Sequence, residues 1–408
     1  MKKSLFFAFI LILGLIACDN DDEADLSTEK KIISFSLRSS ENSNLSKDII
    51  GVIDEDKKTI LLESTEHIPL SNLKPTIRVS EDATIEPNDT LKKDFFTPVT
   101  YTVKAEDEAP ISYIVTIKIT DTSITDRDVL IDWYNLNPNN TLDWDFSENM
   151  EKWSGIKVTN GRVTQIEIDD ENLSLTTPLI SNLDELNSLI IRDNNITMLP
   201  VEIGKLQKLR TLNLTDNELK QLPQEIATLS ELNFLILSNN NLNTLTSHIG
   251  NLSNLIQLEL SFNDLNNLPK EIGQIKSLQN LRLYGNRRLT SLPIEIGNLT
   301  QLVNLDIGWC NLSILPQEIG NLINLIDLRM DENNLVEIPS TIGNLINLKT
   351  LQLQKNRILE LPPEMGQLSS LLVLFVQENQ LTSLPNELCN LIDSNNISFN
   401  KDVGVSCP

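Results

Sequence analysis

Residues 255–277 read LIQLELSFNDLNNLPKEIGQIKS, and residues 278–301 read LQNLRLYGNRRLTSLPIEIGNLTQ. The two stretches share one pattern: Leu at positions 1, 4 and 6, Asn at position 9, and then Leu-Pro and Ile-Gly. Self-similarity at such a fixed period is typical of a solenoid, in which each repeat is covered only by its neighbours. The segment LxxLxL alternates as a β-strand does and does not fit a helix period of 3.6.

The unit occurs ten times over residues 163–393, at a period of 23 residues with one extra residue in the turn 286–289. Leu at positions 1, 4, 6, 11, 14 and 21 and Ile at position 18 are expected inside, where each contributes about 1.5 to 3 kcal/mol on burial. The amide of Asn at position 9 is expected to satisfy backbone groups where the chain leaves the strand. The repeats begin at Val163, Leu186, Leu209, Leu232, Leu255, Leu278, Leu302, Leu325, Leu348 and Leu371.

This consensus resembles the leucine-rich repeat, in the form that carries Leu-Pro and Ile-Gly on its convex side. The resemblance implies an α/β solenoid whose parallel strands line one concave face. Residues 122–162 are expected to form a linker and N-terminal cap, because Trp144, the segment 153–156 (WSGI) and the segment 161–163 (GRV) resemble the cap of plant-type leucine-rich ectodomains. That family's paired Cys are missing, and the Trp residues are expected in the core of the cap. Residues 394–408 are expected to form the C-terminal cap.

The first residues are expected to direct export. Residues 1–18 read MKKSLFFAFILILGLIAC, in which thirteen apolar residues would form about 20 Å of helix, too short for a hydrocarbon core of about 30 Å. The stretch is therefore interpreted as a secretory signal. Its end resembles the bacterial lipoprotein box, which implies that residues 1–17 are removed and that Cys18 carries the acyl chains, palmitate among them. An ordinary signal peptide with an incidental Cys is the alternative.

The segment that follows is strongly acidic. Residues 19–25 read DNDDEAD, and the whole of 18–30 is expected to be a solvated tether. The segment also resembles the export signal of surface lipoproteins of the Bacteroidetes, which implies an outer-membrane protein facing the cell exterior. Retention in the periplasm is the alternative.

Short alternating runs over residues 31–121 predict an all-β domain. In YIVTIKI (113–119), residues of odd number are apolar or aromatic and share one face, which indicates a sheet with one covered side. The stretches LKPTIRVSEDATIEP and FFTPVTYTVKAED resemble an immunoglobulin-like domain common in Bacteroidetes lipoproteins, which implies a β-sandwich. We interpret it as a spacer, with contact to carbohydrate or protein as the alternative.

Composition disfavours several classes of function. Lys and Arg number 33 against 57 Asp and Glu, a net charge of -24 that would repel nucleic acid. Two His, and no His-x-x-x-His, Cys-x-x-Cys or Gly-x-Ser-x-Gly motif near them, leave no candidate constellation for nucleophilic or zinc catalysis. We expect a monomeric binding protein without enzymatic activity, cofactor or metal site.

The cysteines are expected to have structural roles. Cys310 stands at position 9 of its repeat, where the family accepts Cys in place of Asn, and is expected to be buried. Cys389 replaces the usual Gly of the last repeat, and Cys407 follows 18 residues later. In an exported protein disulfides persist, so this pair is expected to bridge the C-terminal cap.

Side chains at repeat positions 3, 5, 7 and 8 are expected to project from the concave strands. Aromatic residues of successive repeats gather in the middle of this surface, and exposed aromatics beside Arg are typical of binding hot spots. We expect a protein ligand from a host or a neighbouring cell; a glycan stacked on the same rings, as in nutrient capture, is the alternative. Rings that merely pack on their neighbours would be the structural alternative. The candidate binding residues are Phe234, Glu259, Phe262, Arg282, Tyr284, Asp306, Trp309, Asp327 and Arg329.

Overall fold

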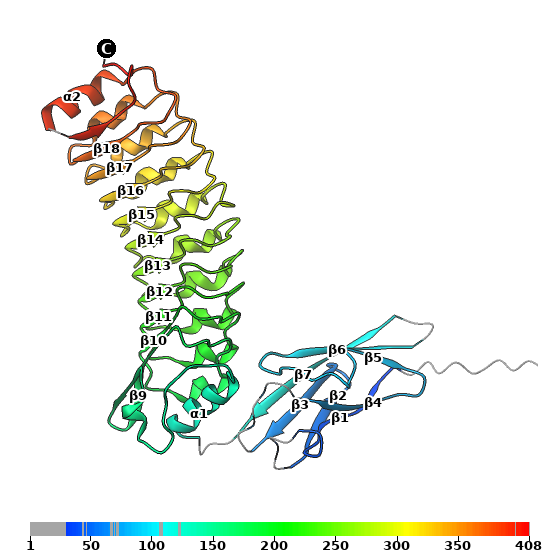
Figure 1. Ribbon diagram of the computed structural model, residues 1–408. Coiled ribbons are helices and arrows are strands. Elements are labelled where there is room, and N and C mark those ends of the chain that lie inside the picture. The colour runs from blue at the N-terminus through cyan, green and yellow to red at the C-terminus, as the bar shows by residue number, and fades with distance from the viewer. Residues whose placement is uncertain are drawn as a thin grey trace, which may run out of the picture. The chain divides into compact units, whose positions relative to one another are not determined.

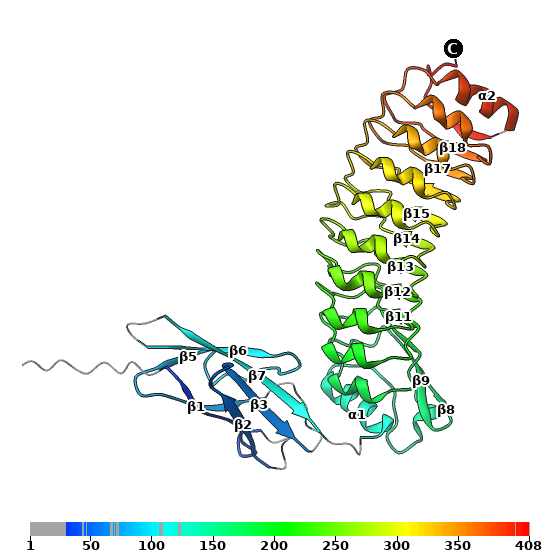
Figure 2. The same cartoon turned by 180° about the vertical axis from the view of Figure 1, so that it is seen from behind.

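The computed structural model describes residues 30–407, except 43–44, 46, 66–67, 69, 71–72, 106–108, 121–123 and 396. The chain forms two compact units, and it passes from the first to the second after Lys118 (Figures 1 and 2). The predicted signal peptide, the lipidation residue Cys18, residues 18–29 of the tether and His67 lie outside the described residues.

The first unit contains seven strands in the hydrogen-bonded order β4-β1-β2-β3-β7-β6-β5. The alternation seen in the sequence places one residue in two in the core, as in β7, where Tyr113 and Val115 are buried and Ile114 is exposed. The strands are β1 (Ile32–Leu37), β2 (Ile49–Asp54), β3 (Thr59–Ser64), β4 (Pro75–Val79), β5 (Thr84–Glu86), β6 (Val99–Lys104) and β7 (Ile111–Ile119).

The strands of this unit enclose a core between two layers. Strand β2 pairs with β1 ahead of Gly51 and with β3 from Gly51 onwards. A Cβ atom on Gly51 would lie 2.8 Å from Cγ2 of Ile60 and 3.0 Å from the carbonyl oxygen of Phe35, so only Gly fits at this change of partner. Phe35 of β1 contacts Tyr101 of β6, with ring centroids 5.3 Å apart, although the two strands are not neighbours in the sheet. The predicted all-β sandwich class is confirmed.

The second unit is a solenoid with one parallel strand per repeat. The strands pair in register, so that Leu258, Leu281 and Leu305 at position 4 stack in the interior. The strands line the concave side of the solenoid and short helices the convex side, as predicted (Figures 1 and 2). The repeat strands are β9 (Arg162–Asp169), β10 (Ser188–Arg192), β11 (Thr211–Asn213), β12 (Phe234–Ile236), β13 (Gln257–Glu259), β14 (Asn280–Arg282), β15 (Asn304–Asp306), β16 (Asp327–Arg329), β17 (Thr350–Gln352) and β18 (Val373–Phe375).

A five-residue 3-10 helix (η) lies on the convex side of each of the first nine repeats. Pro precedes seven of these helices with φ between -64° and -70°, the value its ring imposes. A Cβ on Gly297 would lie 2.5 Å from the carbonyl oxygen of Glu318 in the next repeat, so Gly allows the convex turns to stack closely. The helices are η2 (Pro178–Asn182), η3 (Val201–Lys205), η4 (Gln224–Thr228), η5 (Ser247–Asn251), η6 (Lys270–Gln274), η7 (Ile294–Asn298), η8 (Gln317–Asn321), η9 (Ser340–Asn344) and η10 (Pro363–Gln367).

Asn at position 9 forms the predicted ladder. The side-chain amide of Asn263 donates to the carbonyls of Leu237 (2.9 Å) and Leu260 (3.0 Å), and its Oδ1 accepts from the backbone N–H of Leu242 (2.9 Å). From Asn217 onwards, each ladder Asn joins position 6 of the previous repeat to position 6 of its own and satisfies the amide of position 11 of the previous repeat where that amide needs it. Asn194 satisfies the amide of Leu173 at position 11 but donates to the carbonyl of Arg192 at position 7 of its own repeat. Buried backbone groups need such partners.

Cys310 takes the ladder position in the seventh repeat, and it is buried as expected. The extra residue of the sixth repeat makes this substitution possible, because the amide of Leu289 donates to the carbonyl of Asn286 at 2.9 Å and needs no ladder oxygen. The Cys310 thiol keeps the donor role toward the carbonyl of Leu283, at 3.4 Å. Burial raises the pKa of this thiol to about 12, so it stays protonated at neutral pH.

The N-terminal end is closed by a helix, an aromatic cluster and an antiparallel strand. Buried Asp126 accepts from Nε of Arg162 (3.1 Å) and from the N–H of Val163 (2.6 Å), which ties the helix to the first repeat. Trp144 and Trp153 stack with ring centroids 5.1 Å apart and are buried, so they are core residues as expected. The elements of this end are α1 (Asp126–Leu136), η1 (Met150–Lys152) and β8 (Ile156–Thr159).

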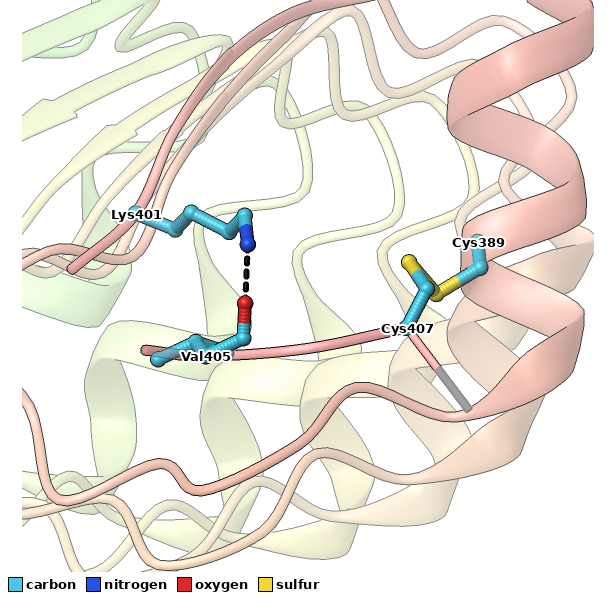
Figure 3. Close-up of a disulfide and its surroundings, with 4 residues drawn as sticks. All are labelled: Cys389, Lys401, Val405 and Cys407. Carbon is cyan, nitrogen blue, oxygen red and sulfur yellow. Dashed lines mark hydrogen bonds between the residues drawn. A yellow bond between two sulfur atoms is a disulfide. The ribbon is translucent and has the colours of Figure 1, made fainter. Parts of the chain in front are cut away.

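The C-terminal end is closed by α2 (Asn386–Asn395), β19 (Ser398–Asn400) and the tail. Cys389 of α2 and Cys407 form a disulfide with Cα atoms 6.0 Å apart, and Lys401 donates to the carbonyl of Val405 in the same tail (Figure 3). Earlier repeats mostly have Gly at the position of Cys389, where the next convex turn stacks closely. A side chain is tolerated here because, within the described residues, no convex turn stacks on α2 in this way. The disulfide instead holds the tail against the exposed end.

Candidate functional site

The charged candidate residues form a row across the concave strands. In-register pairing places Glu259, Arg282, Asp306 and Arg329 side by side at position 5 of four successive repeats. Adjacent strands are about 4.8 Å apart, so the row alternates in charge over about 15 Å. The charges at position 5 therefore neutralise one another in pairs, and the row does not create a strongly positive or strongly negative electrostatic potential.

A hollow of about 340 Å³ opens over this row. The Nη1 atom of Arg282 lies 2.8 Å from Oε1 of Glu259, and Nη2 of Arg329 lies 2.9 Å from Oδ2 of Asp327. Asp306 is half-buried and accepts from the N–H of Gly308 at 3.1 Å. Burial raises the pKa of the Asp306 carboxyl, while the hydrogen bond to the Asp327 carboxylate raises the pKa of Arg329. The hollow brings together four of the predicted residues: Arg282, Asp306, Asp327 and Arg329.

Three of the predicted aromatic residues form one cluster, here called the aromatic platform: Phe262, Tyr284 and Trp309. Their ring centroids lie 5.4 Å (Phe262 to Tyr284), 5.9 Å (Phe262 to Trp309) and 5.8 Å (Tyr284 to Trp309) apart. The Phe262 ring stands edge-on to the other two, at 70° and 75°. Burial, and then the carboxylates around it, raise the pKa of the Tyr284 hydroxyl, which remains protonated. The rings do pack on one another, but Phe262 remains 44% exposed, so the platform is also a surface.

Two platform residues stand at a backbone position that disfavours them. Position 8 has a positive φ in all ten repeats, between 49° and 79°, and the other repeats place Asp, Asn, Gly, Glu or Lys there. Phe262 has φ 53° and Trp309 has φ 49°, which is a rare conformation for a bulky side chain and costs of order 1 to 3 kcal/mol. Such local violations concentrate at functional sites, which makes the platform a candidate binding site.

The chain makes room for the platform with two glycines. A Cβ on Gly285 would lie 2.9 Å from the Phe262 ring and 3.3 Å from the Trp309 ring. A Cβ on Gly308 would lie 2.9 Å from the Tyr284 ring. The rings therefore lie directly on backbone, which fixes their orientation.

Sequence reasoning did not include Arg287 in the site. Its Cζ lies 3.7 Å from the centroid of the Trp309 ring, which makes it part of the edge of the platform. Arg287 belongs to the turn that carries the extra residue of the sixth repeat, and this departure from the period was the signal that could have identified it.

Other candidates lie apart from the platform. Phe234, at position 3 of the fourth repeat, is 37% exposed, and within the described part of the chain it has no ring contact with the platform. Within the same residues no group of three His, Cys, Asp or Glu is arranged to hold a metal ion.

Family models match both units. The model described as "Leucine-rich repeat region" matches residues 156–261, 238–332 and 313–400, which together cover more than half of the chain. The chain therefore belongs to the leucine-rich repeat family. The model described as "SGBP, N-terminal", of the surface glycan-binding proteins of the Bacteroidetes, matches residues 32–117, and neither model describes an enzyme.

Solved structures show the same solenoid. A leucine-rich-repeat protein of Leptospira interrogans is 34% identical, with a TM-score of 0.54 over 59% of this chain and 60% of that one. The chain thus spans 60% of the length of that relative. A plant ice-binding protein is 21% identical, with a TM-score of 0.52 over 70% of this chain and 97% of its own, and it is similar in fold alone. No curated protein matches the chain.

The two families together indicate a surface binding protein of Bacteroidetes type. Across the described residues, none of the helices has the length and apolar character needed to cross a membrane.

Proposed function

We propose that this chain is a lipid-anchored protein of the outer membrane, facing the cell exterior, whose solenoid binds a protein through the aromatic platform. The observation that carries the proposal is the platform itself, because two of its rings occupy a left-handed backbone position at a cost in stability. Clustered Trp, Tyr and Arg side chains are the residues that most often dominate binding energy at protein interfaces.

The arrangement of the rings favours a protein over a glycan. A sugar ring stacks on an open, flat aromatic face. One face of Trp309 is occupied by Arg287, and Phe262 stands edge-on to its neighbours. The side chains of a protein can pack into the gaps between rings that stand at different angles. A protein ligand therefore fits this geometry better than a sugar ring does.

Replacement of Trp309 or Tyr284 by Ala is expected to weaken the protein complex by about 2 kcal/mol or more, which is about 30-fold in Kd. Neither residue belongs to the interior Leu lattice, so the fold is expected to remain. The mature chain, immobilised, captures partners from the surface proteins of neighbouring cells. Mass spectrometry identifies each captured protein, and calorimetry gives its Kd for the parent and the variants.

Ile294→Ala is the control, because Ile294 is an exposed apolar residue (59%) on the convex side of the repeat that contains Tyr284. Its affinity is expected to equal that of the parent. A partner that binds equally well to the Trp309 and Tyr284 variants would remove the platform from the binding surface.

The glycan alternative is favoured by one observation, the match of the first unit to the surface glycan-binding family. A glycan array probed with the same variants separates the two functions. If the chain binds a saccharide and Trp309→Ala loses that binding, the ligand of the platform is a glycan and not a protein. If saccharide binding persists in Trp309→Ala, the first unit binds the saccharide.

Anchoring rests on Cys18, which follows the apolar run directly. Cys18→Ala is expected to move the protein from the membrane fraction to the soluble fraction of expressing cells, because acyl chains supply the anchor. Fractionation and metabolic labelling with palmitate give the result, with Cys310→Ser as the matched control that keeps its lipid. A Cys18→Ala protein that still sediments with membranes and incorporates the label would rule out this anchor.

A further inference from the structure

Arg287 differs from most arginines of the repeats in having no carboxylate partner. Five of the seven are within 4 Å of a carboxylate, among them Arg288, whose Nε lies 3.7 Å from Asp264. Within the described residues, the exposed Arg287 side chain has neither an ion pair nor a hydrogen bond, and its contact is the Trp309 ring. In a chain of net charge -24, an unpaired arginine held in place is unusual. The five paired arginines are Arg192, Arg210, Arg282, Arg288 and Arg329.

A hollow of about 500 Å³ lies beside this residue. Asn311 and Asn334, which are hydrogen-bonded to each other, line it together with Trp309 and Arg287. Lys355 and Glu332 also line the hollow, but they neutralise each other, with Nζ 2.9 Å from Oε1. Among the described residues that line this hollow, Arg287 is therefore the cation without an ion pair.

The stacking prepares the guanidinium for a bidentate contact. A guanidinium that stacks on a ring leaves the N–H groups in its plane free to point outward, and these match the two oxygens of a carboxylate. Trp309 also restricts the side-chain freedom of Arg287 in advance, which reduces the entropy lost on binding.

We propose that Arg287 and this hollow bind a carboxylate of an Asp or Glu side chain in an acidic segment of the partner protein. The inference rests on the proposed protein-binding function and adds the chemistry of the partner: an apolar surface on the platform, followed at its edge by an acidic residue. An acidic saccharide carries the same carboxylate, but Arg287 already occupies one face of the Trp309 ring, which leaves less of that ring for a sugar to stack on.

The first test uses N-acetyl-glutamate amide as the probe and the ¹⁵N-labelled mature chain as the protein. Addition of the probe is expected to shift the Trp309 indole N–H and the Arg287 Nε–H signals in a saturable way. The buried Trp144 and Trp153 provide internal controls that do not shift. The neutral analogue N-acetyl-glutamine amide is expected to cause no shift, and Arg287→Gln is expected to abolish the response.

The outcomes are distinct. No saturable shift of Trp309 at the solubility limit of the probe, or an equal shift with the neutral analogue, would overturn the carboxylate site. Glucuronate that binds at least about tenfold more tightly than the amino-acid probe would overturn the protein assignment in favour of an acidic glycan.

The second test measures the affinity of the partner that is captured through the platform. Arg287→Gln is expected to weaken it by about tenfold or more, and Arg287→Lys by less, because Lys keeps the charge but loses the bidentate contact. Arg357→Gln is the matched control, since Arg357 is exposed and also unpaired within the described residues but has no ring contact there. Loss of affinity in Trp309→Ala with none in Arg287→Gln would leave the proposed function intact and reject the inference. No loss in either variant would reject the proposed function itself.

Discussion

Replacement of Asn286 by Ala is expected to lower the free energy of unfolding by about 3 kcal/mol. The Asn286 side chain is fully buried, and its amide donates to the carbonyls of Leu260 (2.9 Å) and Leu283 (2.7 Å). Its Oδ1 accepts from the amide of Leu265 at 3.1 Å. The N–H of Leu265 would be left buried without a partner, which costs about 1 to 3 kcal/mol. The two carbonyls keep other donors, the Asn263 side chain at Leu260 (3.0 Å) and the Asn286 backbone N–H at Leu283 (3.3 Å), so each loses one bond worth about 0.5 to 1.5 kcal/mol. Urea denaturation followed by circular dichroism measures the change.

Two control variants test the cause. Asn298→Ala removes the same side chain from an exposed convex position and is expected to change stability by less than about 0.5 kcal/mol. Cys310→Ala is expected to cost only about 1 kcal/mol, because the amide of Leu289 has its own partner and the thiol is a weak donor. A loss in Cys310→Ala as large as that in Asn286→Ala would contradict the compensation between the extra residue and the missing ladder Asn.

The solenoid could be predicted from the sequence because each of its physical requirements recurs in every repeat. The Leu at position 4 must be buried, and a one-residue shift of register would expose it, so the pattern determines the strand and its face. The ladder Asn was predictable for the same reason. The fold of the first unit was harder to predict, because the order of its strands depends on contacts between segments that are distant in the sequence. The change of pairing partner at Gly51, for example, has no signal in the local alternation of apolar and polar residues.

The candidate site could be predicted only in part, and its role in binding stays a prediction. The register identified the rows of side chains that project from the strands, and so Phe262, Tyr284 and Trp309. Periodicity does not give backbone dihedrals, and the positive φ at position 8 became visible only in the structure, although the frequent Asp and Asn there are consistent with it. Arg287 was not predicted because it belongs to a turn, where the consensus makes no statement about orientation.

Departures from the consensus gather in the fifth, sixth and seventh repeats, beginning with Phe262 at position 8 of the fifth. The extra residue allows Cys310 to replace Asn and brings Arg287 onto Trp309, while Gly285 and Gly308 make space for the rings. A repeat selected for stability alone would keep Asn at position 9 and a small polar residue at position 8. Departures in three adjacent repeats are consistent with the proposed binding function, which stays a prediction.

Loss of the Cys389–Cys407 disulfide is expected to have an effect of similar size at the C-terminal end. The bridge closes a span of 18 residues, for which the loop-entropy model gives about 3 kcal/mol. Without it the tail can leave the end of the solenoid, where Leu388 and Val405 are buried. A terminal repeat without its cap exposes the interior of the coil, so α2 and β19 are expected to open before the central repeats. Hydrogen exchange of Cys389→Ser measures this local opening, and thermal denaturation measures the overall loss.

The matched control for this variant is Cys310→Ser, which removes a thiol but no bridge and is expected to leave exchange in α2 unchanged. Mass mapping of unreduced peptides is expected to find Cys389 joined to Cys407 and Cys310 as a free thiol. Because burial holds the pKa of Cys310 at about 12, iodoacetamide is expected to modify it only after unfolding. If hydrogen exchange in α2 is the same in Cys389→Ser and in the parent, packing alone closes the solenoid and the disulfide is not needed. If mass mapping finds Cys310 in a disulfide, its place in the ladder is contradicted.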